Sequence, residues 1–329
     1  MANAGHTPRF DGQAVLVTGG GRGMGKAHAQ LLAELGASVV IADAGVDLYG
    51  AGSDEAVASL AAAELRGRGL SACSYTGDLA TEDGARGAVQ SAVDAFGRVD
   101  AIIHNAGFTL GTMPMEQESF GRLEKQLAIN TRAAFLIAQE AWPHFVRMGG
   151  GRIVIAGSTA MYGLPGSTPY SVAKSSYIGL CRALAGEGAD HNIAVNLIAP
   201  AGATRMAENM PNSAFRSWFL DQMKPELVSP AVAWLAHPEC SVNGQIFVVG
   251  GGRIARTIIS ETHGSMMAEP TLAAARDAIE AALDGDQAIT IEHFSDSMDL
   301  MARQLGFSGN AAPRFAGDAA SQPARGTDA

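Results

Sequence analysis

The chain has little cysteine, few aromatic residues and no long apolar run. Its 329 residues include three cysteines. Cys73, Cys181 and Cys240 lie far apart and lack the spacing of metal ligands, so we expect buried thiols and no metal site. No segment reaches the roughly 18 consecutive apolar residues of a membrane span, which argues against a membrane partner. Forty glycines and only 6% aromatic residues are expected where many turns and close helix–strand contacts need small residues.

Basic residues are also scarce. Asp and Glu number 33 against 23 Lys and Arg, which gives a formal net charge of -10. This balance, without any basic cluster, argues against a nucleic-acid partner. Residues 1–13 lack the basic-then-apolar order of a signal peptide, and the last residues, "GTDA", are not a peroxisomal address. We therefore expect a cytoplasmic protein that acts on a small molecule.

Apolar segments rich in β-branched residues recur along the chain, with segments of helical spacing between them. The predicted strands are residues 14–19, 38–43, 70–75, 99–107, 151–158, 193–200 and 244–251. They are apolar throughout rather than alternating, which is typical of strands covered on both faces. Strands that alternate with helices predict βαβ units with right-handed crossovers. The predicted fold is therefore α/β, a single doubly wound Rossmann domain with a seven-stranded parallel sheet.

The strand pattern stops near residue 260. Residues 271–285 and 294–306 have the apolar spacing of two amphipathic helices. The last residues are rich in Ala, Gly, Pro and Ser, a composition typical of disorder. The predicted organisation is a Rossmann domain at 1–259, a helical C-terminal extension at 260–307 and a disordered tail at 308–329.

The segment "TGGGRGMG" (18–25) lies between the first predicted strand and a helix. There, Gly19, Gly23 and Gly25 permit a tight turn and close approach of a pyrophosphate, and the helix N-terminus offers unpaired N–H groups to phosphates. Asp43 ends the second strand, where a carboxylate can accept hydrogen bonds from both ribose hydroxyls and repel a 2′-phosphate. The pattern predicts NAD rather than NADP; the alternative is a structural turn with a capping Asp.

Two further features lie near this turn. Arg22 has two interpretations, a phosphate contact or a solvated surface residue. Residues 43–54, "DAGVDLYGAGSD", form an unusually long glycine-rich connection after the second strand.

The TGxxxGxG spacing of the turn resembles that of the short-chain dehydrogenase/reductases, and the resemblance runs from about residue 10 to 256. "DL" (78–79), "NAG" (105–107), Asn130, Ser158 and "YSVAK" (170–174) match the family in the same order. The resemblance implies that Asp78 contacts the adenine ring and that the NAG segment lines the cofactor cleft. The other cofactor contacts that it implies are Arg22, Met24, Leu79, Asn105, Ala106, Gly107, Tyr170, Lys174, Pro200 and Thr204.

Tyr170 and Lys174 are four residues apart in a predicted helix, so both side chains project from one face. A free phenol has a pKa near 10 and is a poor base at neutral pH. An ammonium group one turn away, together with a positive nicotinamide ring, favours the phenolate. Tyr170 is therefore predicted to take the hydroxyl proton while hydride leaves the same carbon for NAD. The alternative is a buried Tyr beside a solvated Lys.

The resemblance implies two more catalytic residues. Ser158 ends the fifth strand, where the family places the hydroxyl that holds the substrate oxygen. It precedes Tyr170 by 12 residues where the family usually has one more, and Thr159 is the nearest substitute. Asn130 matches the residue that kinks its helix and holds a water between the lysine and solvent. Its other interpretation is a helix-interior Asn bonded to a neighbouring carbonyl.

Three segments depart from the commonest pattern of the family: residues 43–54, "APAGATRM" (199–206) and residues 223–257. Together they resemble the dehydrogenase domains of peroxisomal multifunctional β-oxidation enzymes and their bacterial relatives, over the Rossmann part but not from about residue 260 onward. This resemblance implies NAD-dependent oxidation of a (3R)-hydroxyacyl-CoA to the 3-ketoacyl-CoA. It also implies a homodimer or homotetramer.

A CoA substrate needs cations for its phosphates, preferably Arg. Arg205, Arg253 and Arg256 are candidates, although solvated surface arginines would look the same. Residues 209–223 resemble a helical lid, whose apolar side chains either line a substrate pocket or pack on the core. Two other functions stay open: a hydroxysteroid or other secondary-alcohol dehydrogenase that does not use CoA, and a non-catalytic nucleotide sensor.

Overall fold

The computed structural model describes residues 7–205, 212–267, 269–283 and 288–307. The chain divides into two compact units, Met1–Arg256 and Thr257–Ala329, whereas the sequence-based boundary falls after residue 259. The predicted tail (308–329) lies outside the described residues, as do residues 206–211, which include the start of the predicted lid.

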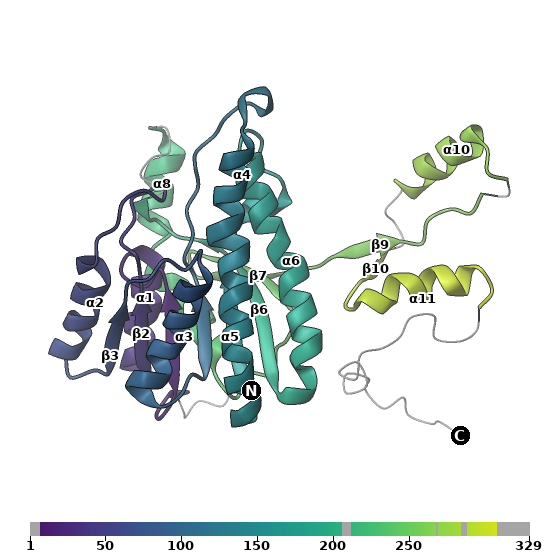
Figure 1. Ribbon diagram of the computed structural model, residues 1–329. Coiled ribbons are helices and arrows are strands. Elements are labelled where there is room, and N and C mark those ends of the chain that lie inside the picture. The colour runs from purple at the N-terminus through teal and green to yellow at the C-terminus, as the bar shows by residue number, and fades with distance from the viewer. Residues whose placement is uncertain (1–6, 206–211, 268, 284–287, 308–329) are drawn as a thin grey trace, which may run out of the picture. The chain divides into compact units, whose positions relative to one another are not determined.

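The first unit is built on an eight-stranded sheet with the order β3-β2-β1-β4-β5-β6-β7-β8 (Figure 1). The strands that match the predicted segments are β1 (Ala14–Thr18), β2 (Ser38–Ala42), β3 (Ala72–Tyr75), β4 (Ala101–His104), β5 (Gly151–Ala156), β6 (Ile193–Ala201) and β7 (Ile246–Gly250). The pairings from β3 to β7 are all parallel. The predicted doubly wound α/β fold is confirmed.

The predicted number of strands was one too few. β8 (Arg253–Thr257) pairs with β7 at the edge of the sheet. Gly251 and Gly252, the two residues between these strands, have φ of 56° and 79°, as in the tightest hairpin turns. Such a short connection joins only antiparallel neighbours. β8 is mostly exposed, so it lacks the continuous apolar pattern that identified the other strands.

Helices cover both faces of the sheet, as right-handed crossovers require. α1 (Gly23–Glu34), α2 (Ala56–Gly67) and α9 (Ser229–Ala236) lie on one face. α3 (Glu82–Phe96), α5 (Ala133–Met148) and α6 (Thr168–Gly188) lie on the other (Figure 1). α4 (Phe120–Leu127) packs on α6, and α8 (Ala214–Gln222) follows β6. Short 3₁₀ turns span Met115–Gln117, Thr159–Tyr162, Ala189–His191 and Pro225–Leu227.

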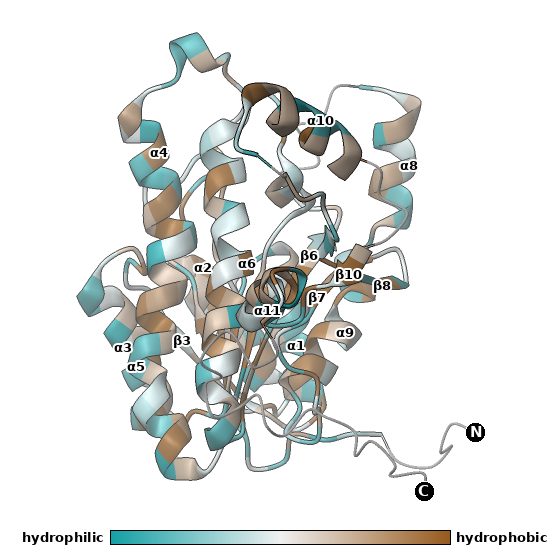
Figure 2. Ribbon diagram, turned by 90° about the vertical axis from the view of Figure 1, so that its right-hand side faces the viewer, coloured by the Kyte–Doolittle hydropathy of each residue, from teal (hydrophilic) through white to brown (hydrophobic). Residues whose placement is uncertain are grey.

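The core lies along the central strands, where apolar residues concentrate (Figure 2). Every residue of β1, β4 and β5 is buried, which explains why their sequences are mostly apolar. Cys181 and Cys240 are buried as predicted, whereas Cys73 is only half-buried. Cys73 lies on β3, and this strand is an edge of the sheet with a neighbour on one side only.

The second unit contains the two predicted helices, α10 (Leu272–Ala282) and α11 (Phe294–Gln304). It also contains two strands, β9 (Ser260–Thr262) and β10 (Ala288–Thr290), which pair antiparallel. The expectation that strands stop near residue 260 was wrong, because three-residue strands are too short to show a periodic pattern. No helix in the described part of the chain is long and apolar enough to cross a membrane.

Candidate active site

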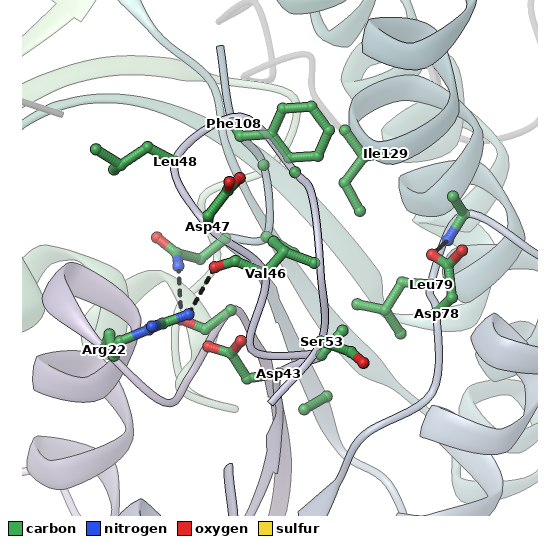
Figure 3. Close-up of a pocket in the computed structure, with 18 of the residues that line it drawn as sticks. Arg22, Asp43, Val46, Asp47, Leu48, Ser53, Asp78, Leu79, Phe108 and Ile129 are labelled. Atoms are coloured by element: carbon green, nitrogen blue, oxygen red, sulfur yellow. Dashed lines mark hydrogen bonds between the residues drawn. The ribbon is translucent and has the colours of Figure 1, made fainter. Parts of the chain in front are cut away.

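A cavity of about 560 Å³ lies at the carboxyl ends of β1 to β4 (Figure 3). The strand order reverses here between β1 and β4, which is where doubly wound sheets bind their ligands, and the volume is typical of a ligand pocket. The predicted cofactor residues in its lining are Gly19, Arg22, Gly23, Met24, Asp43, Asp78, Leu79, Asn105, Ala106, Gly107 and Thr204. Gly25, Pro200, Tyr170 and Lys174 are not part of the lining.

The glycine turn brings backbone against backbone. A Cβ on Gly25 would overlap the carbonyl group of Gly19, and a Cβ on Gly19 would lie 3.0 Å from the Cα of Ala106. α1 begins at Gly23, and no side chain caps its first turn. Its unpaired N–H groups and positive dipole end therefore fit the diphosphate of a dinucleotide.

Asp43 is held in place at the end of β2 by the backbone. Its Oδ2 accepts a hydrogen bond from Gly21 N at 3.0 Å, and its Oδ1 accepts one from Gly45 N at 2.9 Å. Each carboxylate oxygen keeps a second lone pair, so the group can still accept hydrogen bonds from ribose hydroxyls. Because the carboxylate is anchored on both sides, it is not easily displaced by a 2′-phosphate.

Arg22 lines the cavity, so its contact with a phosphate stays a prediction. Its Nη2 donates to the carbonyl oxygen of Val46 at 2.7 Å (Figure 3), and its Nε is buried without a hydrogen-bond partner. The guanidinium group therefore ties the glycine turn to the connection at residues 43–54.

The connection at residues 43–54 forms one wall of the cavity. The Asp47 carboxylate accepts hydrogen bonds from the N–H groups of Ala51 (2.9 Å) and Tyr49 (2.8 Å), and these bonds lower the pKa of Asp47. Gly50 packs directly on the ring of Phe108, and Lys125 Nζ lies 5.4 Å from the centroid of that ring. Phe108 and Lys125, both in the lining, carried no motif that would have identified them.

The NAG segment is tied to the glycine turn by Thr18. Thr18 Oγ1 accepts hydrogen bonds from Asn105 N and Ala106 N, each at 3.0 Å. Asn105 Nδ2 donates to the carbonyl oxygens of Thr18 and Gly19, both at 3.3 Å. Thr18 belongs to the quoted motif, but its spacing alone gave it no role.

The remaining cofactor candidates have simpler surroundings. Asp78 Oδ1 accepts a hydrogen bond from Ala80 N at 3.0 Å, and Leu79 is buried. Thr204 lies close to Gly23, and Met24 packs against Gly202. Pro200 lies in β6 and pairs in register with Val249.

Ser158 and Tyr170 come together outside the cavity lining. The Ser158 side chain is hydrogen-bonded to the Tyr170 phenol, and Ser158 Oγ also accepts from Ala160 N at 3.1 Å. Thr159 is exposed, so Ser158 is the hydroxyl in position despite the shortened spacing. Burial raises the pKa of Tyr170, and the hydrogen bond from Ser158 opposes this rise.

Lys174 is buried rather than solvated. Its Nζ donates to the carbonyl oxygen of Ala156 at 3.0 Å and lies 5.7 Å from the ring centroid of Tyr170. Burial lowers the pKa of Lys174 to about 7. Near neutral pH the amine is therefore only partly charged, and it stabilises a Tyr170 phenolate less than a full ammonium would.

Asn130 lies in a π-helical turn, Ala128–Arg132, between α4 and α5. Its Nδ2 donates to the backbone carbonyl oxygen of Gln126 at 2.9 Å, so the bond to a neighbouring carbonyl is present. Its Oδ1, however, is buried without a partner. A Cβ on Gly107 would lie 2.6 Å from this Oδ1 and 3.4 Å from Lys174 Nζ. The unpaired oxygen and the lysine therefore face the same small space beside Gly107.

The candidate CoA-binding arginines do not form one cluster around the cavity. Arg205 is in its lining, whereas Arg253 and Arg256 lie on β8 outside it. Arg256 Nε donates to Gln245 Oε1 at 2.7 Å. The described part of the predicted lid is α8.

Comparisons with known proteins show the family of this chain. The family described as short chain dehydrogenase matches residues 13–214. A short-chain type dehydrogenase/reductase of Mycobacterium tuberculosis is 37% identical over 265 residues, which cover 80% of this chain and 91% of that protein. The mouse peroxisomal multifunctional enzyme type 2 is 36% identical over 266 residues, which cover 79% of this chain and 34% of that enzyme. This chain therefore spans about a third of the mouse protein.

Two solved structures extend the comparison. Full-length peroxisomal multifunctional enzyme type 2 from Drosophila melanogaster superposes with a TM-score of 0.73 and 25% identity, covering 90% of this chain and 49% of that chain. A 7α-hydroxysteroid dehydrogenase complexed with NADH and 7-oxo glycochenodeoxycholic acid superposes with a TM-score of 0.66 and 28% identity, covering 74% of this chain and 95% of that chain.

The Drosophila match also corrects an expectation from the sequence. Its 90% coverage exceeds the part of the chain up to residue 259, so the likeness does not end near residue 260. The sequence motifs gather around the cofactor site, and the second unit contains none that would have revealed its relationship.

Since the family pattern spans more than half of the chain, this protein is an oxidoreductase that belongs to the short-chain dehydrogenase family.

Proposed function

We propose that the protein oxidises the secondary alcohol of a (3R)-3-hydroxyacyl-CoA to a ketone with NAD. The observation that carries the reaction type is the contact between Ser158 and Tyr170, with the buried amine of Lys174 beside them. The likeness of residues 43–54, 199–206 and 223–257 to the multifunctional β-oxidation enzymes supports the thioester substrate.

The choice of NAD rests on Asp43. Its carboxylate lines the cavity and is fixed by two backbone N–H groups, where it would accept hydrogen bonds from ribose hydroxyls. A 2′-phosphate would place negative charge against this anion. The glycine turn and the uncapped α1 terminus would hold the diphosphate.

Four side chains have separate roles in the proposed reaction. Ser158 Oγ would hold the substrate oxygen, and Tyr170 Oη would take its proton. Lys174 Nζ, when protonated, would stabilise the phenolate that Tyr170 must become. When bound, NAD accepts the hydride, and its positive ring adds to the field that favours this phenolate. Asn130 Oδ1 would hold a water beside Lys174 in the space next to Gly107.

Two features of the substrate side agree with an acyl-CoA. Phe215 and Trp218 on α8 are exposed, with ring centroids 5.6 Å apart, and Phe215 also contacts Phe219 at 6.1 Å. Exposed apolar clusters of this kind mark binding surfaces. Arg205 supplies a cation in the cavity lining.

A hydroxysteroid is the second candidate substrate. It is favoured by the superposition on the 7α-hydroxysteroid dehydrogenase and by the exposed aromatic face of α8. Assembly into dimers or tetramers and a cytoplasmic location stay predictions; the mouse and Drosophila relatives are named as peroxisomal enzymes.

The test is an NADH-absorbance assay with a panel of alcohols. The panel contains (3R)- and (3S)-3-hydroxyacyl-CoA thioesters, steroid alcohols and simple secondary alcohols. We expect turnover of the (3R)-thioesters and little with their (3S)-epimers. Activity confined to alcohols without a thioester would overturn the acyl-CoA proposal and favour the second candidate.

A further inference from the structure

Tyr177 lies one turn beyond Lys174 on α6 and is completely buried. Its hydroxyl donates to the carbonyl oxygen of Asn130 at 2.9 Å. Its ring lies under Lys174, with Nζ 4.8 Å from the centroid, a distance at which a cation is attracted to the π face. One buried side chain therefore touches both the lysine and the asparagine of the proposed catalytic set.

His104, at the end of β4, is a second buried side chain near the backbone of Asn130. Its Nδ1 lies 3.3 Å from Thr18 Oγ1. Because that oxygen already accepts two backbone N–H groups, its own proton remains for Nδ1, and His104 must carry its proton on Nε2. Nε2 is buried without a hydrogen-bond partner, and the Asn130 backbone acts to raise the pKa of His104.

His104 adds no charge to this buried region. Burial, with the charge of Lys174 as a second cause, lowers the pKa of His104 to about 3. Burial and the neighbouring Tyr170 raise the pKa of Tyr177 well above its ordinary value. Among the described residues, the titratable groups that face Lys174 are Tyr170 and Tyr177 from α6 and His104 from β4. Lys174 is therefore the one group of this set that carries charge near neutral pH.

We infer that Tyr177 is a positioning residue of the catalytic site. Its hydroxyl fixes the Asn130 carbonyl, and its ring supports Lys174, so that Asn130 Oδ1 is left to face Lys174 Nζ. The inference rests on the proposed roles of Tyr170 and Lys174. In this arrangement the backbone carbonyl of Asn130 has a structural role as the acceptor of the Tyr177 hydroxyl, whereas its side-chain oxygen faces Lys174.

Tyr177→Phe tests the inference, since it removes the hydroxyl and keeps the ring. Without the bond to its carbonyl, Asn130 no longer holds Oδ1 toward Lys174, and the ammonium loses the water that Oδ1 would hold beside it. The pKa of Lys174 then falls, Tyr170 ionises less readily, and oxidation requires a higher pH. We expect kcat for oxidation to fall about tenfold and the acid limb of its pH profile to rise by about half a unit, while the NADH dissociation constant stays within about twofold.

Ser176→Ala provides a matched control. Ser176→Ala removes a 2.8 Å hydrogen bond to Thr131, which joins the same π-helical turn to the same helix without touching Lys174. It should leave kcat and the pH profile unchanged.

An NMR titration of the Lys174 side chain gives a readout that does not depend on turnover. A Lys174 pKa and a kcat in Tyr177→Phe that equal those of the wild type would overturn the inference, as would an equal effect of Ser176→Ala. If the wild type oxidises no alcohol of the panel while the Lys174 pKa falls in Tyr177→Phe, the proposed function fails and the positioning role stands.

Discussion

At the scale of single residues, the buried amine of Lys174 links the proposed chemistry to stability. Its pKa in the folded protein is about 7, below its ordinary value of 10.5. Between these values the unfolded chain binds more protons than the folded one, so the free energy of unfolding should rise with pH over this window. The contribution of this one group is at most about 1.4 kcal/mol per pH unit.

Lys174→Met removes this dependence. We expect the free energy of unfolding of the wild type to increase relative to that of the variant as pH rises from about 7 to 10. Denaturant unfolding of both proteins at several pH values measures the difference. A difference that stays constant over this window would show that Lys174 is not buried as a largely neutral amine.

Motif spacing identified the residues that act together with neighbours in the same short segment of sequence. Asp43, Gly19 and Gly23 line the cavity, and Tyr170 and Lys174 share one region of α6. Arg22 could not be resolved from sequence, because its partner is the Val46 carbonyl of a neighbouring connection. Thr18, His104 and Tyr177 were missed for a related reason. They contact the site through groups that are distant in sequence and become neighbours only when β1, β4 and α6 pack together.

At the scale of elements, the connection at residues 43–54 matters most because it sets the position of Asp43. Gly45 from this connection and Gly21 from the glycine turn donate to opposite oxygens of the carboxylate. Asp43→Ala removes the anion that would repel a 2′-phosphate. We expect the preference for NAD over NADP, as a ratio of kcat/KM values, to fall by about tenfold or more.

Asp47→Ala is the matched control for this prediction. Its carboxylate closes the turn at residues 47–51 of the same connection and does not contact the glycine turn through any described hydrogen bond. The variant should weaken binding of both cofactors alike and keep their ratio. A wild type that already prefers NADP, or an equal change of the ratio in Asp47→Ala, would contradict the role given to Asp43.

The elements predicted from sequence were those that are buried and mostly apolar. β1, β4 and β5 are buried along their whole length and were found. β8 is exposed and was missed, although Gly251 and Gly252 before it are the residues that a tight hairpin turn requires. β9 and β10 have three residues each, and such short strands are defined by their partner rather than by their own sequence.

At the scale of the whole molecule, a cofactor cavity and a set of proton-handling side chains belong to one Rossmann unit. Two residues connect the cavity with these side chains. Gly107 lines the cavity and lies beside Asn130 and Lys174. Thr18 contacts both the NAG segment and His104. The central claim is that this unit transfers hydride from a 3-hydroxyacyl-CoA with Tyr170 as the base.

The most direct test compares the wild type with Tyr170→Phe in NADH formation from a (3R)-3-hydroxyacyl-CoA, with NADH binding followed by fluorescence. The variant keeps the ring and loses the proton acceptor, so kcat should fall by at least about a hundredfold while NADH binding is retained. Turnover by Tyr170→Phe at a rate comparable to the wild type would contradict the account, because another group would then be removing the proton.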